Sequence, residues 1–129
     1  MKTTSIFMVL AVLASFVQAQ WIWQNPLPQG NSLNSVNFYD NNNGLAVGRH
    51  GTVIKTSDGG SSWALISLPT GENLNSVFMT GSNSCIVVGQ SGTAYKMMDV
   101  ASGWIKIQSL PTEDLNAVHF PDFTTGYAV

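Results

Sequence analysis

The residues of this chain that could take part in chemistry are few, and the aspartates come first. Asp58 and Asp99 could each act as a general acid or bind a metal ion. Both stand in short stretches that end on a tryptophan, and the stretch around Asp58 is rich in hydroxyl residues and glycines. In such stretches an aspartate side chain usually accepts hydrogen bonds from the amides of its own turn. We therefore expect the two aspartates to cap turns.

The other candidate metal ligands do not have the residue spacing that known metal sites require. The segment 40–44 resembles a calcium loop, but its glycine comes one position too early and no glutamate closes the loop at the twelfth position. His50 and His119 have no second histidine or carboxylate at ligand spacing. We expect a connecting turn at 40–44, and neither a metal ion nor a cofactor.

Cys85 is the only cysteine of the chain, which therefore forms no internal disulfide. It could be a nucleophile or form an intermolecular bridge. Its neighbours Ile86, Val87 and Val88 instead favour a small buried apolar side chain.

The charge of the chain and its amino-terminal sequence limit the ligands it can bind and predict its cellular location. With 9% charged residues and a net charge of −2, the chain has no basic field for nucleic acid. Residues 1–19 have the pattern of a secretory signal: Lys2, an apolar run over 6–17, and a small-residue cleavage site ending at Ala19. That run is shorter than the roughly 20 residues that span a bilayer. We predict a secreted, periplasmic or cell-surface protein, without a stable membrane anchor once the signal is cleaved before Gln20.

A repeat organises the rest of the chain. Leu33-Asn34-Ser35-Val36 recurs at 74–77 and, with alanine for serine, at 115–118, each step being 41 residues. Further positions keep the same offset, among them the glycines 48 and 89 and the tryptophans 63 and 104. The predicted organisation is a lead-in strand in 20–32, repeat one at 33–73, repeat two at 74–114 and a truncated third repeat at 115–129.

Each repeat contains short apolar segments separated by turn residues, which predicts four antiparallel strands. Four strands in a repeat of about 40 residues are typical of a blade of a β-propeller. The predicted fold is therefore all-β, an incomplete propeller of about two and a half repeats. The strands are expected near 33–39, 45–48, 52–56 and 63–68 in repeat one, and near 75–79, 86–89, 93–96 and 104–108 in repeat two.

Two motifs carry a family resemblance. Thr56-x-Asp58-x-Gly60-x-Ser62-Trp63 resembles the Asp-box, the hairpin of BNR repeats in sialidases and related propellers. The sequence from Leu33 to Trp63 as a whole resembles the propeller repeat of the photosystem II stability/assembly factor type. Repeat two keeps Asp99 and Trp104 but replaces the other Asp-box residues, which leaves its turn geometry open. The resemblance implies structural roles for all seven motif residues, and the two tryptophans are expected to pack between blades.

The resemblance implies an exported, non-enzymatic propeller that binds another protein. The alternative is a carbohydrate-active or glycan-binding propeller, sialidase-like or polysaccharide-cleaving, with catalytic residues beyond Val129. Sialidases bind their substrate carboxylate through several arginines, whereas this chain has only Arg49. A glycosidase needs two acids across a cleft, and Glu72, Glu113 and Asp114 fall in the links between repeats. The sequence therefore leans against an enzyme.

Binding residues are expected at one end of the strands. Turns alternate between the two ends of a blade, so the loop after each second strand shares an end with the links between repeats. Loops at one end of a rigid scaffold often carry binding residues. In the assembly-factor family the position after Val-Gly is often arginine, which Arg49 matches and Gln90 does not. The expected binding face contains Arg49, His50, Gln90, Ser91 and Glu72, together with Gln29, Gly30, Asn31, Gly71 and Asn73.

Overall fold

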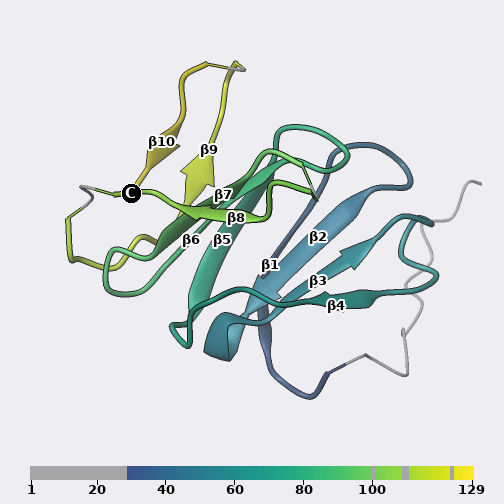
Figure 1. Cartoon of the computed structure of the whole chain (residues 1–129), viewed down its shortest axis with the longest axis horizontal. Helices are drawn as coiled ribbons and strands as arrows, with labels where there is room; N and C mark the ends of the chain where they lie inside the picture. Colours follow the sequence, from purple (N-terminus) through teal and green to yellow (C-terminus); the bar gives the residue numbers. More distant parts are fainter. Residues whose placement is uncertain (1–28, 100, 109–110, 123) are drawn as a thin grey trace, which may run out of the picture.

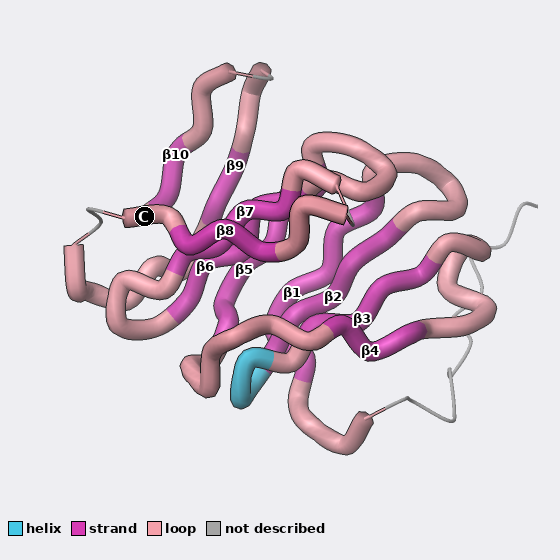
Figure 2. The backbone as a smooth tube through the Cα atoms, in the orientation of Figure 1, coloured by secondary structure: helices cyan, strands magenta, loops and turns pink. Residues whose placement is uncertain are grey.

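The computed structural model describes residues 29–99, 101–108, 111–122 and 124–129 (Figure 1). The predicted signal peptide at 1–19 and residues 20–28 of the lead-in segment, including Trp21 and Trp23, lie outside the described residues. The described residues form two four-stranded antiparallel sheets and one two-stranded hairpin. In Figure 2 strands and loops account for almost the whole tube, and one short 3₁₀ turn is the exception.

The first sheet follows chain order, each strand pairing with the next. It consists of β1 (Leu33–Phe38), β2 (Gly44–Gly48), β3 (Val53–Thr56) and β4 (Ala64–Ile66), with the 3₁₀ turn η1 (Arg49–Gly51) between β2 and β3. The second sheet repeats this arrangement with β5 (Leu74–Met79), β6 (Cys85–Gly89), β7 (Ala94–Met97) and β8 (Trp104–Lys106). The C-terminal hairpin consists of β9 (Val118–His119) and β10 (Tyr127–Ala128).

The predicted strands are present and begin within one residue of their expected positions. The main difference concerns the fourth strand of each sheet, which was expected over 63–68 and 104–108 but ends at Ile66 and Lys106. The reason is that each is an edge strand with one hydrogen-bonded neighbour, and the chain then turns into a proline-containing link. The pairing register is also the same in the two sheets, because Leu33 pairs with Gly48 and Leu74 pairs with Gly89. Each pair lies next to an irregularity in the pairing of the first two strands of its sheet.

A core lies between the two sheets. Leu45, Val47 and Val53 of the first sheet are fully buried there. They pack against one face of the second sheet, lined by Val77, Met79, Cys85, Val87, Tyr95 and Met97. Burying these side chains stabilises the fold at about 25 cal/mol per Å² of apolar surface removed from water.

A second core of the same design follows one repeat later. Ile86, Val88 and Ala94 of the second sheet, with Ile107 directly after it, are the counterparts of Leu45, Val47, Val53 and Ile66. They pack against Leu115, Val118 and Phe120 of the C-terminal part. Strand β9 accordingly contacts β5 and β6, just as β5 contacts β1 and β2. The stack of first sheet, second sheet and C-terminal hairpin is visible in Figure 1.

Side-chain hydrogen bonds cross both junctions at the same offset. The Asn34 amide donates to the Leu74 carbonyl at 2.8 Å, and the Asn75 amide donates to the Leu115 carbonyl at 2.9 Å. The Val77 amide donates to Ser35 Oγ at 3.3 Å and the Val118 amide to Ser76 Oγ at 3.2 Å. The repeated Leu-Asn-Ser-Val sequence therefore encodes the junction between successive sheets as well as a strand.

No helix in the described part of the chain is long and apolar enough to cross a membrane.

Candidate binding face

Two tight turns form one end of the sheets. In the first, the Thr52 amide donates to the Arg49 carbonyl at 3.1 Å, and in the second the Thr93 amide donates to the Gln90 carbonyl at 2.9 Å. The two central residues of each turn have positive φ: 56° and 67° at His50 and Gly51, and 55° and 66° at Ser91 and Gly92. This is the type I′ geometry that matches the twist of two-residue hairpins.

The glycines are required because the links between repeats run directly over these turns. A Cβ atom at Gly51 would lie 2.1 Å from the Thr70 carbonyl oxygen, and one at Gly92 would lie 2.0 Å from the Pro111 carbonyl oxygen. Neither distance is compatible with a side chain.

Hydrogen bonds fix the turns to the links. The Gly51 amide donates to the Glu72 carbonyl and the Gly92 amide to the Glu113 carbonyl, each at 2.9 Å. The His50 amide donates to Asn73 Oδ1 and the Ser91 amide to Asp114 Oδ1, each at 3.0 Å. We call this region, residues 49–52, 70–73, 90–93 and 111–114, the clasped end.

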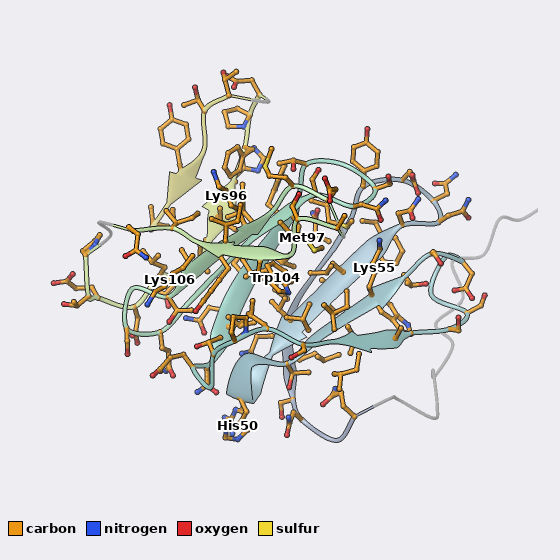
Figure 3. The ribbon with its side chains drawn as sticks, viewed as in Figure 1. His50, Lys55, Lys96, Met97, Trp104 and Lys106 are labelled. Atoms are coloured by element: carbon orange, nitrogen blue, oxygen red, sulfur yellow. The ribbon has the colours of Figure 1, made fainter. Side chains whose placement is uncertain are left out.

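The structure brings the predicted face residues together at the clasped end. Asn73 Nδ2 donates to Gln90 Oε1 at 2.8 Å, which joins the two turns and uses the Gln90 side chain internally. Arg49, His50, Glu72 and Ser91 are exposed. Within the part of the chain that the structure describes, the side chains of Arg49, His50 and Glu72 form no hydrogen bond or ion pair. Figure 3 shows His50 extending from this end into open space.

A groove of about 390 Å³ lies beside the His50 turn. Of the residues that line it, the binding face expected from the sequence includes Gln29, Asn31 and His50 but not Thr52 and Leu68. Asn31 Nδ2 donates to Thr52 Oγ1 at 2.8 Å. No local pattern indicates this contact, because it joins the segment before the first repeat to the start of β3.

At the opposite end of the first sheet, the Asp58 carboxylate organises a turn, as expected. Oδ1 accepts hydrogen bonds from Thr56 Oγ1 and from the Ser62 amide, both at 2.8 Å, and Oδ2 accepts one from Ser62 Oγ at 2.5 Å. The Gly60 amide donates to Thr56 Oγ1 at 2.9 Å. The bonds from Ser62 and Thr56 lower the pKa of Asp58 to about 2, so the carboxylate stays ionised and is a poor general acid near neutral pH.

The equivalent turn of the second sheet keeps its aspartate cap through a different serine. Asp99 Oδ1 accepts from the Ser102 amide at 2.7 Å, and Oδ2 accepts from Ser102 Oγ at 3.0 Å. Ser102 stands one position before the counterpart of Ser62, which is Gly103. These bonds, the amide of Ser102 first, lower the pKa of Asp99.

The two tryptophans of the repeats lie in different surroundings in the described part of the chain. Trp104 packs against the core between the two sheets, and Figure 3 shows it beside Met97 in the space between them. Trp63 lines a groove on the face of the first sheet that points away from the second sheet, and its ring meets Phe38 edge-on at a centroid distance of 6.1 Å. No described sheet packs on that face, and the packing of Trp63 between blades stays a prediction.

Other candidate groups serve turns or the core. Asp40 accepts hydrogen bonds from Asn42 and Asn43, and the Asn43 side chain is the main cause of its lowered pKa. Burial raises the pKa of the Cys85 thiol to about 12, so the buried thiol is protonated and unreactive near neutral pH. Among the described residues, no group of three or more His, Cys, Asp or Glu side chains could hold a metal ion.

Repeated four-stranded antiparallel sheets, stacked face to face with aspartate-capped turns at one end, define a β-propeller protein with BNR-like repeats. The chain belongs to the family described as Photosynthesis system II assembly factor YCF48, whose model matches residues 14–117.

Among solved structures, the chain is similar to one described as "YCF48 bound to D1 peptide", with a TM-score of 0.69 and 24% sequence identity. The match covers 80% of this chain but 34% of that one, so the chain spans about a third of the solved propeller. At this identity the likeness concerns the fold. No curated protein matches the chain significantly.

Proposed function

We propose that this chain is part of an exported, non-enzymatic propeller that binds a protein partner through the clasped end. The observation that carries the proposal is a fixed backbone combined with exposed side chains that have no hydrogen-bond or ion-pair partner among the described residues. Arg49, His50 and Glu72 project from turns and links whose amides are hydrogen-bonded across the repeat. Because the backbone is already ordered, a partner that binds there loses little affinity to ordering of the loops.

The chemistry of the face suits a polypeptide ligand. Arg49 offers a planar group of donors that can bind a carboxylate or backbone carbonyls, and Glu72 offers an acceptor nearby. The adjacent groove contains both apolar side chains and the Asn31–Thr52 pair. The solved relative, by its description, binds a peptide, which favours a protein segment as the ligand of this chain too.

The state of the carboxylates supports a role outside catalysis. Asp40, Asp58, Asp99 and Asp122 each accept hydrogen bonds from their own turns, and the pKa of each is lowered. A glycosidase instead needs one acid with a raised pKa opposite a second carboxylate.

The proposal that the protein is exported rests on the signal pattern of residues 1–19. A mature protein that begins at Gln20 in the mass spectrum of the secreted fraction would support it.

Charge reversal at Arg49 tests the binding face. The chain is tagged and cross-linked in the cells that produce it, and the captured proteins are quantified for wild type and for Arg49→Glu. Lys96→Glu is the matched control, because Lys96 is an exposed cation within β7, outside the clasped end (Figure 3). We expect Arg49→Glu to lose the partner and Lys96→Glu to keep it. Unchanged recovery with a folded Arg49→Glu chain would remove Arg49 from the site.

A further inference from the structure

A small pocket lies at the end of the sheets opposite the clasped end. Its volume is about 240 Å³, and its walls come from all three repeats, at the residues around the ends of β1, β5 and β9. In Figure 1 the turns that follow these three strands lie at the same end of the stack. Pockets for drug-sized ligands are typically about 300–1,000 Å³, so this pocket has the size for a single side chain.

Three aromatic rings line this pocket. Phe78 and Phe120 are partly buried, and their ring centroids lie 5.7 Å apart. The Phe78 ring also meets His119 edge-on at a centroid distance of 5.2 Å, so contacts with two rings restrict its orientation. Tyr39 supplies the third ring and is 50% exposed. Because the face of an aromatic ring carries partial negative charge, a pocket with these walls attracts cations.

The carboxylate of Asp122 also lines the pocket. Its Oδ1 accepts hydrogen bonds from the amides of Thr124 and Thr125, both at 2.7 Å, and from Thr124 Oγ1 at 2.8 Å. The bond from the Thr124 amide is the main cause of the lowered pKa of Asp122, so the carboxylate is ionised near neutral pH. Within the described residues its Oδ2 accepts no hydrogen bond. Oδ2 is therefore an acceptor for a ligand.

We propose that this pocket binds one basic side chain, an arginine or a lysine, of another polypeptide. Asp122 would repel an anionic group, and an uncharged apolar group would leave its Oδ2 without a donor. A protonated side chain suits both walls, because its apolar stem lies along the rings and its charged N–H group donates to the carboxylate. The proposal concerns the end opposite the clasped end and does not depend on partner binding there.

Titration of the full chain with blocked amino acids, followed by NMR spectra of the aromatic rings, tests the proposal. The probes are N-acetyl-arginine amide and N-acetyl-lysine amide, with their uncharged isosteres N-acetyl-citrulline amide and N-acetyl-norleucine amide. We expect the basic probes to shift the ring signals of Tyr39, Phe78 and Phe120, with a dissociation constant at least about threefold lower than that of their isosteres. This comparison isolates the charge and requires no variant.

Two variants and a control locate the binding. Asp122→Asn removes the charge but keeps an oxygen acceptor for the turn, and Tyr39→Leu keeps apolar bulk without a ring; each should weaken binding of the basic probes at least about threefold. Glu113→Gln removes an exposed carboxylate at the clasped end and should bind like wild type. Backbone amide spectra verify the fold of each variant. Equal binding of charged and uncharged probes, ring signals that do not shift, or equal effects of Asp122→Asn and Glu113→Gln would each overturn the proposal.

Discussion

At the scale of single residues, aspartates determine the turns of this protein. Asp58 shows the principle most fully, because its two carboxylate oxygens accept bonds from Thr56 and Ser62 and thereby close an eight-residue hairpin, residues 56–63. The same residue type caps the turns at Asp40 and Asp122, which are two repeats apart. Charge on these carboxylates therefore serves structure.

The lowered pKa of Asp58 predicts how stability depends on pH. Its folded pKa of about 2 lies below the usual value of 3.8, so the contribution of the carboxylate is fully present above about pH 4 and is lost as the pH falls toward 2. We expect the melting temperature to fall over this interval, and to fall less steeply in Asp58→Asn, which keeps an acceptor but does not titrate. Thermal melts followed by circular dichroism measure the melting temperature of both proteins at each pH. The same decrease in wild type and in Asp58→Asn would contradict the role assigned to Asp58.

The packing of Trp104 predicts a high cost of truncation. Trp104→Ala removes a ring from the core between the sheets and should cost roughly 3–5 kcal/mol of unfolding free energy. Urea denaturation measures this loss, and a loss below about 1 kcal/mol would show that the ring contributes little to the core.

At the scale of elements, the type I′ turns hold the sheets to the links. Gly92→Ala should destabilise the chain by more than about 1 kcal/mol, since it adds a Cβ at positive φ directly against the Pro111 carbonyl. Ser91→Gly should instead stabilise the chain, because it relieves a left-handed conformation at φ 55°. It leaves the hydrogen bond from the amide of residue 91 to Asp114 intact. Chemical denaturation of this adjacent pair checks the turn geometry, and two changes of the same sign would refute it.

Some elements could be predicted from the sequence because their cause is local or periodic. Alternating apolar residues place the strands, and the offset of 41 residues places each core residue of one sheet opposite its counterpart in the next. The clasped end could be predicted in outline only. Its bonds, such as the one from the His50 amide to Asn73, join residues more than 20 positions apart whose pairing depends on how the sheets stack.

One detail could not be predicted from the sequence for a specific physical reason. Ser102 caps the Asp99 turn from one position earlier than the motif suggests. The backbones of the two turns differ, because Gly59 and Gly60 have positive φ in the Asp58 turn, whereas Gly103, the counterpart of Ser62, has positive φ in the Asp99 turn.

At the scale of the whole molecule, the two ends of the sheets are distinct surfaces. The clasped end carries the exposed side chains of Arg49, His50 and Glu72, and the opposite end carries the Asp58 and Asp99 turns. Each end predicts a different behaviour: partner binding at the clasped end, and turns whose aspartates stay ionised above about pH 4 at the opposite end. They can therefore be tested separately in one protein.

Hydrogen–deuterium exchange with and without the captured partner tests the binding face most directly. We expect slower exchange on binding at the clasped end, in peptides that contain residues 49–52, 70–73 and 90–93, and unchanged exchange at the turns 57–62 and 99–103. Arg49→Glu should lose this protection while Lys96→Glu retains it. Protection confined to the Asp58 and Asp99 turns, or absent from the clasped end while the partner is bound, would contradict the proposed function.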